Sequence, residues 1–146
     1  MRLLCVLFFC SLVSVSFECS CSETSNKELY CKADWVGIFK ITEKRAREDE
    51  IEYKAGIVKM FKTTKNASLT NGVRVTLKTL ADSGVCGIDW LQPKRLYLLS
   101  GKMDGRMLII SLCSQLYLEE WKKVPKLVKR QLKDQRYEPC ENETPK

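Results

Sequence analysis

The sequence predicts a mostly β protein: a five-stranded closed barrel with a flanking C-terminal helix and three disulfides. Three observations lead to this fold class. Short segments rich in β-branched and aromatic residues recur along the chain, with turn residues between them. Near the C-terminus the apolar residues take up helical spacing instead. An even set of six cysteines remains once an N-terminal leader is set aside.

The N-terminus has the pattern of a secretory signal peptide. A basic residue precedes an apolar segment that is too short to span a bilayer as a helix. Ser14 and Ser16 offer a small-x-small cleavage site, and cleavage as late as residue 18 is the alternative. We therefore expect a secreted protein. Its expected parts are a signal peptide at 1–16, one domain at 17–140 and a loose tail at 141–146.

The cysteines predict a disulfide framework. Cys5 and Cys10 leave with the leader, and the six that remain are Cys19, Cys21, Cys31, Cys86, Cys113 and Cys140. In a secreted chain this even number favours three disulfides over a cysteine-rich zinc site. Spacing alone excludes only a Cys19–Cys21 bond, which would close a strained ring. We expect these two sulfurs to bond different distant partners and so to clamp an N-terminal strand to the body.

Composition disfavours several function classes. Without histidine the chain can form neither a Ser-His-Asp nor a Cys-His catalytic site, and it has no imidazole ligand for a metal. Its seven glycines are scattered and form no phosphate-binding loop. We therefore expect no enzyme activity, no cofactor, no metal of its own and no nucleic-acid partner. A monomer without membrane insertion is expected.

Alternating patterns and turn residues give the order of the strands. Residues 42–50 are charged and predict an exposed hairpin turn, and Gly56 is the expected site of a β-bulge. Strands are predicted at 34–41, 51–61 and 73–80, followed by two within 95–113 that the turn at 101–105 connects. In the third strand Val73, Val75, Leu77 and Thr79 are expected to face inward. The acceptor sequences at Asn66 and Asn142 predict glycosylation in surface segments.

The C-terminal part is predicted to be helical. Its periodic apolar residues are Leu118, Trp121, Val124, Leu127, Val128 and Leu132. Pro125 interrupts them and is expected at the first position of a second helical segment. A closed barrel of five strands with such a helix is typical of the OB-fold.

Basic residues are concentrated in this helical region. They are Lys122, Lys123, Lys126, Lys129, Arg130 and Lys133. The net charge of +7 falls to +6 when Arg2 leaves with the leader, since 24 basic residues then face 18 acidic ones. The cluster is a candidate glycosaminoglycan patch, and a solvated helix face is the alternative.

Several segments together resemble a known family. They are "CSCS" at 19–22, "CKADWVG" from Cys31, "SGVCG" at 83–87, "YLLSGKMDG" at 97–105, "LIISLC" at 108–113, Trp121 and "YEPC" at 137–140. In this order and spacing they resemble the inhibitory N-terminal domain of the tissue inhibitors of metalloproteinases, within the netrin-like module family. The resemblance runs over nearly the whole mature chain.

The resemblance implies a disulfide pairing and a site. The pairs would be Cys19–Cys86, Cys21–Cys113 and Cys31–Cys140. An inhibitory ridge would consist of Cys19, Ser20, Cys21, Ser22, Ser83, Gly84, Val85 and Cys86. In the family, the α-amino nitrogen and carbonyl oxygen of the first cysteine, here Cys19, chelate the catalytic zinc of a secreted metalloendopeptidase. The next side chain, here Ser20, points into the substrate pocket.

Two functional hypotheses follow from the resemblance. The first is a metalloendopeptidase inhibitor, which requires that the terminal amine belong to Cys19. Cleavage after Ser16 would instead leave Phe17 and Glu18 ahead of it. The second is a netrin-like binding module that uses the same barrel to bind extracellular matrix or heparan sulfate. The N-terminal residue of the secreted protein separates the two, because fold alone does not determine function.

Overall fold

The computed structural model describes residues 19–64 and 68–140 of the 146-residue chain. Its helices and strands are α1 (Asn26–Lys32), β1 (Trp35–Ala46), β2 (Glu50–Thr63), β3 (Arg74–Leu80), β4 (Leu96–Asp104), β5 (Met107–Ile109) and α2 (Lys126–Lys133). Three 3₁₀ turns complete the order: η1 (Ser83–Val85), η2 (Leu112–Ser114) and η3 (Trp121–Lys123). The predicted signal peptide, the tail at 141–146 and the acceptors Asn66 and Asn142 lie outside the described residues.

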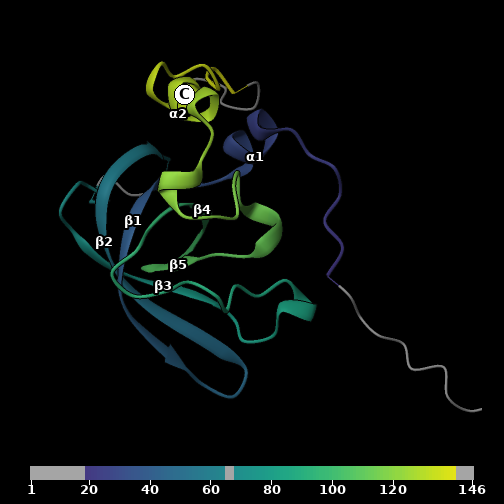
Figure 1. Ribbon diagram of the computed structural model, residues 1–146, viewed down its shortest axis with the longest axis vertical. Coiled ribbons are helices and arrows are strands. Elements are labelled where there is room, and N and C mark those ends of the chain that lie inside the picture. Colours follow the sequence, from purple (N-terminus) through teal and green to yellow (C-terminus); the bar gives the residue numbers. More distant parts are fainter. Residues whose placement is uncertain (1–18, 65–67, 141–146) are drawn as a thin grey trace, which may run out of the picture.

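The strands close into one barrel in the order β1-β2-β3-β5-β4 (Figure 1). Neighbouring strands are antiparallel except β3 and β5, which run parallel and pair only at Leu77↔Leu108 and Lys78↔Ile109. This confirms the predicted five-stranded barrel with a C-terminal helix. Because β5 accompanies β3 for two residues only, the first half of β3 has no strand partner on that side among the described residues. Val73, which was expected to face inward, lies just before β3 and is 37% exposed, whereas Leu77 and Thr79 are buried.

The first hairpin is longer than its sequence predicts. Residues 42–50 were expected to form a turn, but β1 continues to Ala46 and β2 begins at Glu50, which leaves only 47–49 between them. Beyond Ile41 the side chains of β1 are exposed on both faces, so the sequence no longer alternates between apolar and polar residues. The backbone pairing of β1 with β2 nevertheless continues to Ala46. Only β1 loses its second neighbour in this hairpin: it pairs with β4 as far as Lys40, whereas β2 stays paired with β3 from Glu50 to Gly56 and keeps Ile51 and Tyr53 buried.

Gly56 is not the site of a bulge. It pairs regularly with Lys40, and the register shifts instead at Thr42, Val58 and Phe61. A bulge places two residues opposite one and bends the strand, which lets the long β1–β2 pair coil around the barrel. Val58 lies at the register shift between Ile38 and Phe39, where it has no partner in β1, and it is 47% exposed.

The helices differ from the prediction at both ends of the chain. The N-terminal segment, expected as a strand, is irregular at 19–25 and then forms α1. Ser25 caps this helix in a reciprocal pair with Glu28, a Ser-x-x-Glu signal that is visible in the sequence. The C-terminal helix is shorter than the segment over which apolar residues recur at helical spacing. Extended backbone at Val124 and Pro125 separates η3 from α2. Pro125 is therefore the N-cap of α2, one position before the expected one.

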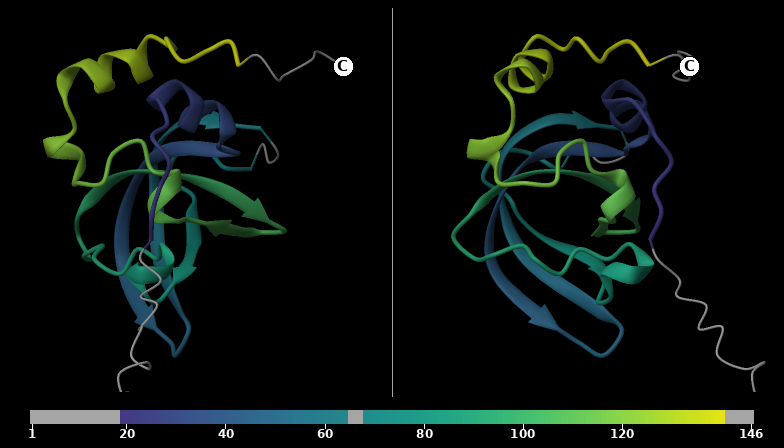
Figure 2. Two further views of the ribbon diagram at one scale, coloured as in Figure 1. Left: turned by 90° about the vertical axis from the view of Figure 1, so that its right-hand side faces the viewer. Right: turned by 45° about the vertical axis from the view of Figure 1, so that its right-hand side comes forward.

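Two hydrophobic clusters stabilise this arrangement. The first fills the barrel and includes Trp35, Phe39 and Tyr53, all fully buried. The second lies outside the barrel, where α1 and α2 cover β1 and β4, and includes Val36 and Leu132. Both helices lie over the same end of the barrel in the two views of Figure 2. No helix in the described ranges is long and apolar enough to cross a membrane.

Candidate functional site

The N-terminal segment at 19–25 lies along the outside of the barrel, beside η1 and η2 (Figure 2). Ser20, Cys21 and Ser22 are exposed, whereas Cys19 is half-buried. Apart from sulfur contacts, residues 19–24 form hydrogen bonds only among themselves within the part of the chain that the structure describes. The segment therefore owes its position to its two disulfides.

The structure joins the same three cysteine pairs that the family resemblance implies. Cys19–Cys86 and Cys21–Cys113 have Cα–Cα distances of 5.0 and 5.2 Å, and Cys31–Cys140 has one of 5.4 Å. The first two bonds lie side by side, with their four sulfurs within 4.8 Å of one another. One bond ties the segment to the residues after η1 and the other ties it to η2. Two attachments this close together restrict both translation and rotation of the segment.

The second part of the ridge is the η1 turn. Asp82 caps it: its Oδ1 accepts a hydrogen bond from the Gly84 N–H at 2.7 Å, and its backbone oxygen accepts one from the Gly87 N–H at 3.0 Å. Cys86 then takes a left-handed backbone conformation with φ of 67°. The turn presents Val85, whose side chain is 48% exposed, next to the Cys19–Cys86 bond. All eight ridge residues are thus brought together at one place on the barrel.

The residues after η1 are fixed to the barrel core. The Ile88 N–H donates to Thr79 Oγ1 at 3.0 Å, and the buried Tyr53 hydroxyl donates to the Ile88 carbonyl at 2.9 Å. Burial raises the pKa of this hydroxyl well above its ordinary value, so it is a neutral donor across the physiological range. The Leu112 N–H donates to the Cys86 carbonyl at 2.9 Å, which connects η1 to the chain before Cys113.

A buried amide holds the η2 side of the site. Gln115 is 6% exposed; its Oε1 accepts from the Ser100 N–H at 3.1 Å. Its Nε2 donates to the carbonyls of Ser100 and Ser111 at 2.8 and 2.9 Å. These bonds attach the segment that carries Cys113 to β4. Sequence reasoning identified neither Gln115 nor Asp82. The Asp-Ser-Gly sequence at 82–84 was the available signal for a capped turn.

Comparison with known proteins identifies the family. A family model described as tissue inhibitor of metalloproteinase matches residues 17–145. The chain belongs to this family. The chain is similar to a Caenorhabditis elegans protein named as a metalloproteinase inhibitor, tag-225, with 26% identity over an alignment of 145 residues. The matched region covers 84% of this chain and 89% of the relative. The tissue inhibitors of metalloproteinases are an inhibitor family, so the comparisons support metalloproteinase inhibition and a metalloproteinase partner, and not an enzyme.

The basic residues of the C-terminal region are partly engaged with their neighbours. Lys122 and Lys123 form ion pairs with Glu120 and Glu119 at 3.1 and 3.2 Å. The ammonium group of Lys129 lies 4.8 Å from the centre of the Trp121 ring. The three other cations are all exposed; they are Lys126, Arg130 and Lys133. The glycosaminoglycan patch stays a prediction, with these three as its most available members.

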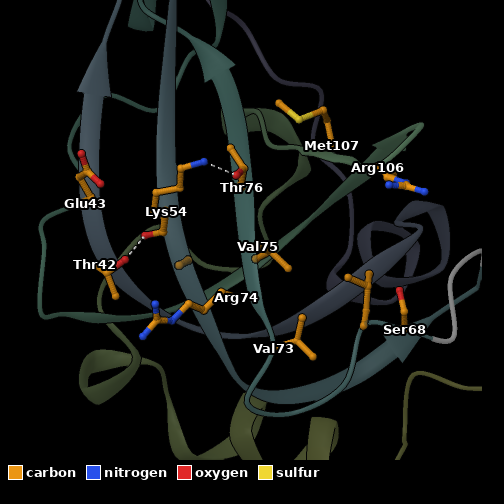
Figure 3. Close-up of a pocket in the computed structure, with 12 residues that line it drawn as sticks. Thr42, Glu43, Lys54, Ser68, Val73, Arg74, Val75, Thr76, Arg106 and Met107 are labelled. Atoms are coloured by element: carbon orange, nitrogen blue, oxygen red, sulfur yellow. Dashed lines mark hydrogen bonds between the residues drawn. The ribbon is translucent and has the colours of Figure 1, made fainter.

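A large hollow on the barrel lies apart from the ridge. It has a volume of about 1100 Å³ and is lined by residues of β1, β2 and β3, of the loop between β2 and β3, and of the β4–β5 hairpin (Figure 3). Along its wall, Lys54 donates a hydrogen bond to Thr76 on the neighbouring strand at 2.8 Å, and Thr42 donates to the Lys54 carbonyl at 3.0 Å. None of the ridge residues lines this hollow. The candidate site is therefore separate from this hollow, and its Cys86 lines a smaller one of about 220 Å³ together with residues of β2, β3 and the chain from β5 to η2.

Proposed function

We propose that the protein is a secreted inhibitor of zinc metalloendopeptidases that inserts its ridge into the active-site cleft of the target. The observation that carries the proposal is the pair of adjacent disulfides, which fixes an exposed segment beginning at Cys19 against the η1 turn. In the proposed complex, the α-amino nitrogen and carbonyl oxygen of Cys19 chelate the zinc of the protease. They replace the water that would otherwise attack the substrate.

The coordination chemistry supports this mechanism. A catalytic zinc site has three protein ligands and leaves one position open for water or substrate. An α-amino group has an ordinary pKa of about 8, so it loses its proton to bind zinc at neutral pH with only a small free-energy cost. Because both donor atoms belong to one residue that is already held in place, little conformational entropy is lost on binding.

Ser20 and Val85 are the side chains most available to the cleft. Ser20 is exposed beside Cys19, and its small hydroxyl fits substrate pockets of many shapes. Val85 is exposed on the adjoining turn and supplies apolar surface next to the Cys19–Cys86 bond. In this proposal the zinc ligand comes from Cys19, and selectivity among proteases comes from Ser20 and Val85.

The proposal is tested by comparing two forms of the protein that differ only at the N-terminus. One begins at Cys19 and the other at Phe17, and the N-terminus of the secreted protein is sequenced in parallel. In the longer form the Cys19 nitrogen is an amide and cannot coordinate zinc as an amine does. We expect its inhibition constant toward a matrix metalloendopeptidase to be at least about a hundredfold weaker, or about 3 kcal/mol.

Two results of this experiment contradict the proposal. One is equal inhibition by both forms, and the other is no inhibition of any zinc endopeptidase by the form that begins at Cys19. In the second case the netrin-like binding module becomes the better hypothesis. In that case the exposed cations on α2 predict that the protein is retained on a heparin column at physiological salt. Substituting Lys126, Arg130 and Lys133 together by Ala should weaken this retention.

A further inference from the structure

The two disulfides of the ridge are close enough to react with each other. Cys113 Sγ lies 3.7 Å from Cys19 Sγ and 3.6 Å from Cys86 Sγ, although its covalent partner is Cys21. Cys113 therefore lies in contact with both sulfurs of the neighbouring bond. We propose that the two bonds form one thiol–disulfide exchange site, at which a single dithiol reductant frees Cys19 and Cys21 together.

The exchange begins at Cys21, which is the exposed member of the four cysteines. A thiolate of the reductant attacks Cys21 Sγ and forms a mixed disulfide, while the electron pair of the broken bond leaves on Cys113 Sγ. The second thiol of the reductant then attacks its own sulfur in the mixed disulfide. This step releases the Cys21 thiol and the cyclic disulfide of the reductant.

The Cys113 thiolate carries the exchange to the second bond. Once freed from Cys21, the Cys113 side chain rotates from its position beside the Cys19–Cys86 bond into line with that bond and attacks Cys86 Sγ. The Cys86–Cys113 bond forms, and Cys19 leaves as a thiolate that takes up a proton. Two electrons enter in total. One of the two protein disulfides is lost and the other is replaced, so that two thiols appear, at Cys19 and Cys21.

Two features favour attack at Cys86 over attack at Cys19. The Leu112 N–H already donates to the Cys86 carbonyl at 2.9 Å, so the chain on either side of the new bond is in place before it forms. The leaving residue belongs to a segment whose hydrogen bonds, within residues 19–24, are internal to it. Once both sulfurs are free, this segment gains conformational freedom, which favours the exchanged product.

The third disulfide lies outside this reaction. Cys31–Cys140 joins α1 to the end of the C-terminal region, and its Cys140 is buried. Its sulfurs are not members of the four-sulfur group. The exchange therefore releases the N-terminal segment while the helices stay tied together.

The test maps the bonds after limited reduction. The wild-type protein is treated at pH 8 with one molar equivalent of dithiothreitol, alkylated, digested without further reduction and analysed by mass spectrometry. We expect the main once-reduced species to contain a Cys86–Cys113 link, alkylated Cys19 and Cys21, and an intact Cys31–Cys140 bond. The proposal is overturned if the main species has Cys21 and Cys113 alkylated with Cys19–Cys86 intact, Cys19 and Cys86 alkylated with Cys21–Cys113 intact, or Cys31–Cys140 opened first.

A pair of variants tests the second step without reductant. Cys21→Ser leaves Cys113 as a free thiol beside the Cys19–Cys86 bond, and we expect the purified variant to carry Cys86–Cys113 with Cys19 open to alkylation. The matched double variant, Cys21→Ser with Cys113→Ser, lacks the attacking sulfur and is expected to keep Cys19–Cys86. An intact Cys19–Cys86 bond in the single variant would contradict the exchange. If the single variant does not fold, the wild-type map alone decides.

The exchange also has a consequence for inhibition, which rests on the proposed function. Freed residues 19–22 no longer have a fixed position, so inhibition should fall in proportion to the fraction of exchanged molecules. If the map shows exchange but the untreated protein inhibits no protease, the exchange site stands and the proposed function fails. If the untreated protein inhibits a protease and no exchange product forms, the proposed function stands and the exchange site fails.

Discussion

Close backbone approach at Gly87 determines where the second part of the ridge can lie. A Cβ at this position would be 2.2 Å from the Leu80 carbonyl oxygen and 2.7 Å from that of Asp82. Both oxygens belong to the backbone, so neither can move aside as a flexible side chain could. The Gly87 N–H donates to the Asp82 oxygen at 3.0 Å, which means that the same contact that excludes a side chain also closes the turn.

We therefore predict that Gly87→Ala destabilises the protein by at least about 2 kcal/mol, since overpacking against backbone forces the chain to shift. Gly56→Ala is the matched control. A Cβ there meets nothing within 4 Å, so we expect a change within about 0.5 kcal/mol. Urea unfolding of both variants measures the difference, and equal stabilities would contradict the interpretation of Gly87.

The side chain after the first cysteine offers a second test at this scale. Ser20→Trp should weaken protease inhibition at least about tenfold, or about 1.4 kcal/mol, because the bulky ring must fit the pocket next to the zinc. Glu23→Trp places the same ring at an exposed position of the same segment outside the ridge, and it should leave inhibition unchanged. Inhibition constants for the two variants decide. Equal weakening by both would show that the segment tolerates no added bulk anywhere and would remove the special role of Ser20.

At the scale of elements, α2 is a short helix that packs on the barrel along one side. Val128 and Leu132 are 8% and 3% exposed and belong to the cluster that α1 also joins, whereas Leu127 is 63% exposed. The helix begins only after Pro125, because a proline ring is incompatible with the helix interior. Its contribution to stability therefore comes from a few buried side chains rather than from its length.

Leu132→Ala should destabilise the protein by about 2–4 kcal/mol, because it removes buried apolar surface and leaves a cavity. Leu127→Ala removes the same atoms from an exposed position and should change the stability by less than about 0.5 kcal/mol. Thermal unfolding of both variants at neutral pH makes the comparison. A large effect at Leu127 would mean that this side chain is covered by a partner or a second copy.

At the scale of the whole molecule, the sequence predicted what depends on local periodicity and missed what depends on contacts between distant segments. Alternation located the strands where one face is buried, as at Leu77 and Thr79. It failed beyond Ile41, where β1 has passed the end of its pairing with β4 and both of its own faces are exposed. Cysteine spacing excluded only one pairing, and the correct set came from the family resemblance. The supporting roles of Gln115 and Tyr53 have no local sequence pattern, because their partners lie on other elements.

A buried tyrosine hydroxyl is one of the links between the barrel and the ridge. Tyr53 is fully buried, and its hydroxyl donates to Ile88, two residues after Cys86. Burial raises the folded-state pKa of this tyrosine, whereas the unfolded chain keeps the ordinary value of about 10. Its stabilising contribution is therefore intact below pH 10. The contribution is lost as the pH rises further, because the unfolded state then releases a proton that the folded state retains.

Tyr53→Phe should reveal this coupling in the pH dependence of stability. At pH 7 we expect the variant to be about 1–2 kcal/mol less stable than the wild type, because the Ile88 carbonyl loses its donor in a buried position. Above pH 10 the wild type alone carries the titrating hydroxyl, so the difference should narrow by about 1.4 kcal/mol per pH unit. Urea unfolding of both proteins between pH 7 and pH 11 measures it. The lysines titrate in both proteins, so their effect cancels in the comparison. If the difference in unfolding free energy stays constant above pH 10, the hydroxyl ionises as freely in the folded protein as in the unfolded chain, and the prediction is contradicted.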